Sequence, residues 1–469
     1  MWSIKRHGPA VFVQLSDAII ADVRRGALRA GDRLPSTRTL AREQGVNRNT
    51  IVAAYDELIA QGWAIAHGAA GTCIASDIPD RFARRPSAAT GLVTRPAFEL
   101  PTHAPAFTPL TAARYSISAG VPDTRLAPTV ALARAYRRAL RRHDTLDYAD
   151  PFGAPRLRAA IAELVRTSRG IPASSTNVMI TRGSQMGIEL AARLLVRPGR
   201  TVAVEQLGYA PAWRSFEQAG ARLVPIPLDD AGLVVDALPR TAPACVYTTP
   251  HHQYPTTVVL APARRLELLA RARRDGFAVI EDDYDHEFHY EGRPIAPLAA
   301  TDRGETVIYC GTLSKTLAPG LRLGFVVAAE RVIEQLGALR ASIDRQGDRV
   351  LETAVAELLE DDELQRHARK VRRLYHARRD ALVAALEREL GDVVSVRVPA
   401  GGITLWVRVA PEVALERWRS RALERGVAFS IGRDFDLTGR PHPFIRIGFA
   451  RYAEVELVEA VRRMRLALP

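Results

Sequence analysis

One lysine, Lys315, lies in a segment whose residue types suit covalent chemistry with an aldehyde. A hydrated ammonium ion is a poor nucleophile, but a desolvated lysine amine near other cations forms a Schiff base with a carbonyl group. The segment, residues 311–324 (GTLSKTLAPGLRLG), follows an apolar run at 307–309 that predicts a buried strand. Lys315 is therefore expected to project from a loop at a strand end, where α/β sheets bind ligands.

Neighbouring polar side chains suit an anionic group on the same ligand. Thr312 and Ser314 carry hydroxyl groups, and the guanidinium of Arg322 binds phosphate or carboxylate through paired hydrogen bonds. The segment resembles the lysine motif of fold-type I aminotransferases, and the resemblance implies that Lys315 binds pyridoxal 5'-phosphate (PLP). The alternative is a solvated lysine in a Ser/Thr loop, because most lysines are exposed. The other contacts that PLP needs must decide between the two.

An acidic cluster, residues 281–285 (EDDYD), ends a second apolar run at 277–280. PLP withdraws electrons only while its ring nitrogen is protonated, and a buried carboxylate beside that nitrogen favours the protonated form. We assign Asp282 to this role and Tyr284 to a hydrogen bond with the ring hydroxyl group. The carboxylates could instead hold a metal ion, but their spacing matches no ligand pattern, so no metal site is predicted.

Further cofactor contacts are expected in loops upstream of the acidic cluster. The strand at 177–181 leads into a helix, and free N–H groups at a helix start attract phosphate, although such residues also serve as plain helix caps. An aromatic ring after the next strand is placed to stack on the PLP ring. The resemblance adds a tyrosine that reaches the phosphate across a dimer interface and a His-Gln-aromatic-Pro signature of a regulator subfamily. These contacts are Gly183, Ser184 and Gln185 for phosphate, Tyr209 for stacking, His252 in the signature, and Tyr148 across the interface.

Two of these assignments have structural alternatives, and three positions depart from the family patterns. Tyr148 equally suits an aromatic anchor before a helix, and His252 a polar loop residue. Leu207 stands where relatives usually have proline. Tyr254 stands where aminotransferases have an asparagine for the ring hydroxyl, and Thr257 where the regulator subfamily usually has glycine. The shapes of these loops are therefore open.

Near the C-terminus, residues 443–448 (PFIRIG) predict a strand that carries one arginine, Arg446. A guanidinium group grips a carboxylate through two hydrogen bonds, which suits an amino-acid ligand. Arg446 is thus the candidate for binding the carboxylate of an effector. A solvated strand arginine is the alternative when the segment is considered alone.

The first 76 residues predict three helices and a small hairpin. Apolar residues recur every fourth position in 11–25, Ser36 is a good N-cap for a second helix, and a third spans about 49–61. A glycine-containing turn separates the last two, which is the helix-turn-helix pattern, and strands around 68–71 predict a wing. The second helix of this motif enters the major groove, where arginine pairs with guanine and asparagine with adenine. The candidate DNA contacts are Arg38, Asn47, Arg48, Asn49 and Thr50.

A helical bundle in which these polar residues only cap helices is the alternative. Residues 10–76 as a whole, however, resemble the winged-helix domain of GntR-type regulators, from LRAGDRLPSTRTLAREQGVNRNTIVAAYDELIAQGW into HGAAGT. The resemblance implies binding to double-stranded DNA.

The chain is expected to have three parts. Residues 1–76 form the winged helix, residues 77–114 form a proline-rich, semi-rigid linker, and residues 115–469 form the aminotransferase-like PLP domain. A smaller α/β C-terminal domain is expected to begin at about residue 345.

Composition limits the class of protein. The 469 residues are 47% hydrophobic and 25% charged, as in soluble globular proteins, and no apolar run approaches the roughly 18 residues of a membrane span. The three cysteines are widely scattered, which favours a reducing cytoplasm. The net charge is +13, yet residues 1–76 hold nine Lys/Arg against six Asp/Glu, so charge alone does not identify a DNA-binding protein.

The combination resembles the MocR subfamily of GntR-type regulators over nearly the whole chain. The resemblance implies a homodimer that controls transcription at promoter DNA through PLP and an amino-acid or amine effector. We expect the effector to replace Lys315 in the Schiff base, giving an external aldimine that changes how the winged helices are held on DNA. A working aminotransferase with an accessory DNA-binding domain is the alternative, and PLP itself as the sensed ligand is a third reading. The effector, the operator and the regulated genes are not encoded in any motif.

Overall fold

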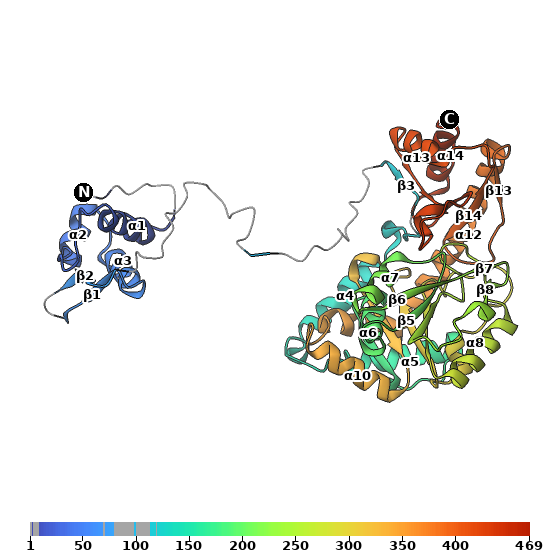
Figure 1. Ribbon diagram of the computed structural model, residues 1–469, viewed down its shortest axis with the longest axis horizontal. Coiled ribbons are helices and arrows are strands. Elements are labelled where there is room, and N and C mark those ends of the chain that lie inside the picture. The colour runs from blue at the N-terminus through green and yellow to red at the C-terminus, as the bar shows by residue number, and fades with distance from the viewer. Residues whose placement is uncertain (1, 3–8, 69–70, 79–97, 100–112, 119) are drawn as a thin grey trace. The chain divides into compact units, whose positions relative to one another are not determined.

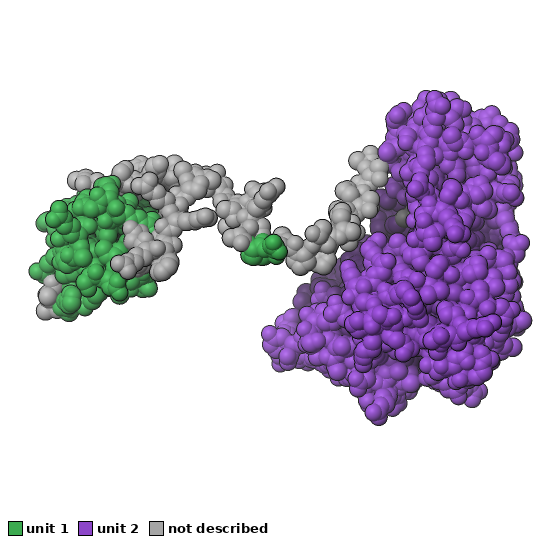
Figure 2. Space-filling model, viewed as in Figure 1, with its two compact units in different colours: residues 1–106 green, residues 107–469 purple. Residues whose placement is uncertain are grey.

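The computed structural model describes residues 2, 9–68, 71–78, 98–99, 113–118 and 120–469. The chain divides into two compact units, residues 1–106 and 107–469 (Figure 2). Most of the predicted linker, 77–114, and the tip of the predicted wing lie outside the described residues. Among the described residues, no helix is long and apolar enough to cross a membrane.

The first unit is a three-helix domain with a two-stranded sheet. Its elements are α1 (Val11–Arg24), α2 (Thr37–Gln44), α3 (Arg48–Ala60) and the antiparallel strands β1 (Ala64–Ala66) and β2 (Thr72–Ile74). The helices predicted from periodicity are confirmed, because their apolar stripes form one core that includes Leu15, Ile19, Leu40, Ile51 and Leu58.

Local capping fixes where α2 and α3 begin. The Ser36 hydroxyl accepts a hydrogen bond from the Thr39 N–H at 3.1 Å and so caps α2. Gly45 ends the helix with φ of +65°, a conformation that glycine adopts without strain. The turn then delivers Asn47 to the N-cap of α3. The helix-turn-helix geometry therefore follows from these capping residues.

The second unit is built on a seven-stranded sheet in the order β4-β12-β11-β10-β9-β5-β6. All of these strands run parallel except β12, which is antiparallel to both neighbours. The strands are β4 (Val178–Thr181), β5 (Thr201–Glu205), β6 (Arg222–Ile226), β9 (Cys245–Thr248), β10 (Ala278–Asp283), β11 (Val307–Thr312) and β12 (Gly324–Val327). The acidic cluster begins in the last residues of β10 and the lysine segment in the last residues of β11, so both lie at the same edge of the sheet.

Helices cover both faces of this sheet (Figure 1). They are α4 (Thr129–Leu140), α5 (Pro155–Arg169), α6 (Ser184–Leu195), α7 (Ala210–Gln218), α8 (Pro262–Asp275), α9 (Leu298–Asp302), α10 (Glu330–Ala341) and α11 (Arg349–Glu360). Successive residues of each strand point their side chains to opposite faces of the sheet. Val279 and Tyr309 pack in the core that contains α5 and α8, whereas Ile280 and Cys310 pack in the core that contains α6 and α10.

The C-terminal part forms a smaller α/β domain around a four-stranded antiparallel sheet, in the order β13-β14-β17-β16. Its elements are α12 (Glu363–Leu390), β13 (Val394–Val396), β14 (Thr404–Val409), α13 (Leu415–Glu424), β15 (Val427–Ala428), β16 (Ser430–Ile431), β17 (Phe444–Gly448) and α14 (Glu454–Leu466). The short strand β3 (Tyr115–Ser116) joins it from far upstream, because it pairs in parallel with β15. A small hairpin, β7 (Leu228–Asp229) and β8 (Gly232–Leu233), belongs to the larger domain and packs Leu233 into its core.

The small domain begins later in the chain than residue 345, the start expected from the sequence. Residues of α11, such as Leu351 and Val355, belong to the core of the larger domain, with α5 and β4. Tyr115 and Ile117 instead belong to the core of the small domain. The small domain is therefore assembled from α12 onward together with an upstream strand, an arrangement that depends on tertiary contacts and has no local sequence signal.

Candidate functional site

A cavity of about 260 Å³ lies where β10 and β11 end, and Lys315 lies on its wall. We call it the Lys315 cavity. Most residues expected to bind the cofactor and the effector line it, namely Ser184, Gln185, Tyr209, Asp282, Tyr284, Thr312, Ser314, Lys315, Arg322 and Arg446. It is also lined by Gly120, Val121, Thr249 and Tyr254. Segments far apart in the sequence thus contribute to one site.

The amine of Lys315 is held in a low-dielectric environment. It follows the end of β11 by three residues, and its Nζ donates a hydrogen bond to the Gly120 carbonyl at 2.8 Å. Burial, followed by repulsion from Arg446, lowers the pKa of Lys315 to about 8. With this pKa, roughly a tenth of the amine is uncharged at pH 7 and about half at pH 8, and the uncharged amine is the state that attacks a carbonyl group.

Asp282 supplies an unsatisfied carboxylate oxygen at the cavity wall. Its Oδ2 accepts a hydrogen bond from the Tyr247 hydroxyl at 2.7 Å, whereas its buried Oδ1 has no partner among the described residues. Burial raises the pKa of Asp282 to about 7. A buried polar atom without a partner is costly, so an N–H group from a ligand would stabilise it. The protonated ring nitrogen of PLP is such a group, and Asp282 therefore fits the assigned role.

The start of α6 and the Lys315 segment form an anion-binding corner. Gly183 is the N-cap of α6, with φ of +74°, and no side chain caps the helix. A Cβ atom at Gly183 would lie 2.8 Å from Nη2 of Arg322, so only glycine lets this guanidinium approach the helix start. The Ser314 hydroxyl is buried without a hydrogen-bond partner among the described residues. Free helix N–H groups, a guanidinium and an unused hydroxyl fit the phosphate of PLP.

Gln185 lies in this corner, and half of its side-chain amide is already used. Its Nε2 donates to the Pro211 carbonyl and to the Ser215 hydroxyl, both at 3.0 Å, which ties α6 to α7. Its buried Oε1 has no partner among the described residues, and its backbone N–H is the donor available near the helix start.

Two tyrosine rings and a buried arginine also line the Lys315 cavity. The rings of Tyr209 and Tyr254 meet edge to face with centroids 5.5 Å apart. The guanidinium of Arg446, on β17, lies 4.2 Å from the centre of the Tyr254 ring and is 2% exposed. Its Nη1 donates to the Ser118 carbonyl at 3.4 Å, and its Nε has no partner among the described residues. A carboxylate entering the cavity would neutralise this buried cation.

Three expected cofactor contacts differ in detail from their assignments. Tyr284 lines the cavity, but its hydroxyl donates to the His252 carbonyl at 3.0 Å, so its proton is not directed at a ligand. His252 does not line the cavity; its ring is buried, and its Nδ1 lies 2.7 Å from Oδ1 of Asp285. Tyr148 is 76% exposed beside Arg345, outside the cavity. A contact of Tyr148 with phosphate would need a second subunit.

Sequence reasoning missed several residues of the site. Tyr247 bonds Asp282 because β9 and β10 are neighbours, a fact that only the strand order supplies. Gly120 and Val121 line the cavity, but they belong to a segment that has no strong sequence pattern. In the sequence, Tyr254 stands out only as a departure from the expected asparagine. An aromatic residue before proline, in a loop that follows a buried strand, is nevertheless a signal that could have predicted its place at the site.

On the first unit, the candidate DNA contacts gather around the start of α3. Arg38, Asn47, Arg48 and Asn49 are exposed and Thr50 is partly buried. Nε of Arg48 donates to the Thr37 hydroxyl at 3.3 Å, which links α3 to α2. Oδ1 of Asn47 accepts from the Asn49 N–H at 2.9 Å as a helix cap, so only the amide nitrogen of Asn47 remains for a base.

Comparison with known proteins defines the class of each unit. Residues 13–74 match the gntR family of bacterial regulatory proteins, and residues 116–464 match the class I and II aminotransferases. The solved structure of LysN, an α-aminoadipate aminotransferase from Thermus thermophilus in complex with N-(5'-phosphopyridoxyl)-L-leucine, superposes with a TM-score of 0.70 at 30% identity. It covers 75% of this chain and 91% of its own. The second unit thus has the fold-type I aminotransferase fold.

Two curated relatives share both units. The chain is 32% identical to the probable rhizopine catabolism regulatory protein MocR of Rhizobium meliloti, over 97% of this chain and 93% of the relative. It is 31% identical to the pyridoxine biosynthesis transcriptional regulator PdxR of Corynebacterium glutamicum, over 84% and 82%. The chain belongs to the MocR subfamily of GntR-type regulators.

Proposed function

We propose that the protein is a PLP-dependent transcriptional regulator that binds promoter DNA through its winged helix and senses PLP, an amino-acid-type effector, or both. The observation that carries the proposal is the Lys315 cavity, in which Lys315, Asp282 and Arg446 meet, on the same chain as a helix-turn-helix unit. We also propose that it works as a cytoplasmic homodimer, in which Tyr148 of one subunit reaches the other.

Each group in the cavity has a distinct task. PLP would supply an aldehyde and an electron-withdrawing ring when bound. The Lys315 amine would hold the aldehyde carbon, and Oδ1 of Asp282 would accept a hydrogen bond from the protonated ring nitrogen. Ser314, Arg322 and the start of α6 bind phosphate. Arg446 binds a carboxylate, which selects amino acids over simple amines.

Sensing requires that the effector prefer one conformation of the protein. An amino acid whose amine displaces Lys315 and whose carboxylate binds Arg446 contacts both domains, because Lys315 follows the large sheet and Arg446 lies in the small one. Such a ligand favours the conformation in which the two domains approach each other. That shift is the signal we propose the winged helices report at DNA.

A second candidate function is an active aminotransferase that carries an accessory DNA-binding unit. The specific observation in its favour is that the lysine, the ring-nitrogen carboxylate and the carboxylate-binding arginine all line one cavity. The recognition surface at the start of α3 argues for the regulator, since a metabolic enzyme has no use for it.

One experiment distinguishes these functions. Full-length protein with PLP is tested in gel shifts on its own upstream DNA, with and without a panel of amino acids, beside a keto-acid assay with the same amino donors. Specific DNA binding that an amino acid or PLP alters supports the regulator. Turnover at an ordinary enzymatic rate without specific DNA binding would establish the aminotransferase instead. Saturation of the response by PLP alone would identify PLP as the sensed ligand.

A further inference from the structure

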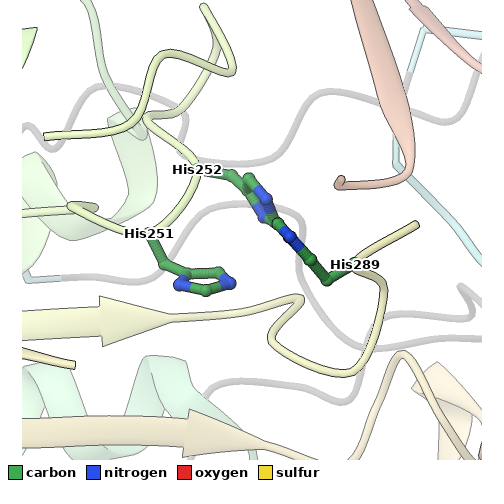
Figure 3. A group of neighbouring side chains, drawn as sticks. All are labelled: His251, His252 and His289. Carbon is green, nitrogen blue, oxygen red and sulfur yellow. The ribbon is translucent and has the colours of Figure 1, made fainter. Parts of the chain in front are cut away.

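Three histidines from two loops lie close together, and none of them lines the Lys315 cavity. His251 and His252 follow β9, and His289 lies in the loop that follows β10 (Figure 3). Because β9 and β10 are adjacent parallel strands, these loops leave the sheet at the same edge. One ring nitrogen from each histidine lies within 4.8 Å of one from each of the others. We call these three residues the histidine cluster.

Two members of the histidine cluster have unsatisfied ring nitrogens. His251 is 3% exposed, and neither of its ring nitrogens has a hydrogen-bond partner among the described residues. Both ring nitrogens of His289 are buried as well; the backbone of Glu291 is close enough to bond one of them, which leaves the other without a partner among the described residues. Buried polar atoms are nearly always paired, because burying one without a partner costs on the order of 1–3 kcal/mol. A ligand that accepts imidazole lone pairs would remove this cost.

The third histidine is oriented as metal-binding histidines commonly are. Nδ1 of His252 lies 2.7 Å from Oδ1 of Asp285, and both side chains are buried. A carboxylate on one ring nitrogen fixes the tautomer and leaves the other nitrogen, Nε2, as the donor to a metal ion. A Cβ atom at Gly401 would lie 2.5 Å from this Nε2, so the glycine keeps the space beside the donor atom open.

The histidine cluster lies next to a second cavity, which shares no lining residue with the Lys315 cavity. His289 lines this cavity of about 470 Å³, which is bounded on its other side by residues of α12. Both ring nitrogens of His289 are buried, so an ion entering from this side would need a small movement of that side chain, but no movement of the groups around Lys315. This independence separates the cluster from the site already described.

We propose that His251, His252 and His289 bind a divalent transition-metal ion, with Zn²⁺ as the expected occupant and a water molecule as fourth ligand. Three imidazoles and an open position are a set that Zn²⁺ accepts in tetrahedral geometry. Zinc–nitrogen bonds of about 2.0–2.1 Å place such nitrogens about 3.4 Å apart, so small side-chain rotations must close the wider separations. The sequence predicts no metal site here, because the third histidine lies in a different loop from the adjacent pair.

The proposed ion would be joined to the Lys315 cavity by two short connections. The Tyr284 hydroxyl donates to the His252 carbonyl, and Asp285, which orients His252, follows Tyr284 in the chain. Tyr284 itself lines the Lys315 cavity. The ion would thus fix the loop that begins with Tyr284, directly after the end of β10 that carries Asp282, a structural role that does not depend on the proposed function.

The test uses full-length protein without a polyhistidine tag, stripped with a chelator and titrated with Co²⁺ as a visible-absorbing probe. We expect one Co²⁺ per chain, with the intense visible bands of tetrahedral coordination, and displacement by Zn²⁺. His251→Ala and His289→Ala should each weaken binding at least about 100-fold, and Asp285→Asn about 10- to 100-fold. The matched control is His143→Ala, an exposed histidine outside the cluster, which should leave binding unchanged.

Several results would overturn the proposal. They are the absence of saturable Co²⁺ binding, octahedral bands alone, or equal binding by the wild type and His289→Ala. Circular dichroism and the absorption of bound PLP show whether each variant is folded. If His251→Ala does not fold, His289→Ala decides the matter alone, since that residue is only partly buried.

Discussion

The Lys315 cavity and the recognition face of α3 present their functional groups in opposite ways. In the cavity, burial shifts the pKa of Lys315 down to about 8 and that of Asp282 up to about 7, and polar atoms remain unsatisfied. On α3, Arg48 and Asn47 are exposed and make ordinary local hydrogen bonds. A buried site thus reveals its ligand through the groups left without partners, whereas an exposed site gives no such sign and is identified by its motif.

The strongest test of the buried side of this comparison is removal of the amine. Lys315→Ala should abolish borohydride-stable attachment of PLP and the visible absorption of the bound cofactor, because no other amine lies on the cavity wall among its lining residues. The sequence contains only two other lysines, Lys5 and Lys370. Lys370→Ala, at an exposed position on α12, is the control and should retain both signals. An unchanged band in Lys315→Ala would refute the assignment.

Removing the buried cation should produce the next largest effect. Arg446→Ala is expected to weaken the response to amino acids at least about 30-fold, since losing one member of a buried charge pair costs roughly 2 kcal/mol or more. Absorbance titration with amino acids measures this change. The control is Arg408→Ala, an exposed arginine on the adjacent strand β14, which should behave like wild type. Equal responses in the two variants would show that Arg446 is not the carboxylate site.

The exposed side is tested by Arg48→Ala. Loss of a base contact by arginine costs about 1–3 kcal/mol, so specific DNA affinity should fall roughly 10- to 100-fold, while PLP attachment is unchanged. Gel shifts at fixed salt concentration on operator and scrambled duplexes measure the effect. A uniform loss on both duplexes would assign Arg48 to phosphate rather than to a base.

The pH dependence of PLP attachment sharpens the contrast between buried and exposed amines. Because only the neutral amine attacks, the second-order rate should rise about tenfold per pH unit below the pKa of Lys315, which is about 8, and become level above it. An exposed lysine, with a pKa near 10.4, would show a rate that still rises at pH 9. Stopped-flow absorbance on PLP-free protein makes the measurement, and a rate that still rises at pH 9 would contradict the low pKa.

The smallest effect is expected for Tyr148, which is exposed in one subunit and is proposed to reach the other. Tyr148→Phe keeps the ring beside Arg345 and removes one hydrogen bond, so PLP affinity should fall roughly 3- to 10-fold. Equilibrium dialysis at concentrations where the protein is dimeric tests this. An unchanged affinity would return Tyr148 to the role of a surface aromatic residue.

Sequence reasoning was most successful where a local pattern fixes the structure. The apolar runs before the acidic cluster and before the lysine segment are the adjacent strands β10 and β11, and the periodicity of residues 11–61 gives the three helices of the first unit. Parallel strands that end at one edge bring Asp282 and Lys315 to one cavity, so this pair followed from the motifs.

The rest of the site depends on contacts that no local pattern records. Tyr247 reaches Asp282 through strand order, and Arg446 reaches Tyr254 through the docking of the small sheet. His252 is expected at the cofactor but lies outside the Lys315 cavity, where its ring bonds Asp285. The small-domain boundary was placed too early because α11 resembles any amphipathic helix until its packing partners are known.

The short strand β3 has a mechanical consequence. Backbone hydrogen bonds of 2.9 Å from Tyr115 to Gly426 and from Ile117 to Ala428 anchor the incoming chain to the small domain, rather than to the sheet that carries Lys315. Shortly after β3, the Gly120 carbonyl accepts a hydrogen bond from the Lys315 amine. The segment that enters the second unit is therefore paired with the small domain and also touches Lys315, so a rotation of the small domain would change the contact that holds this amine.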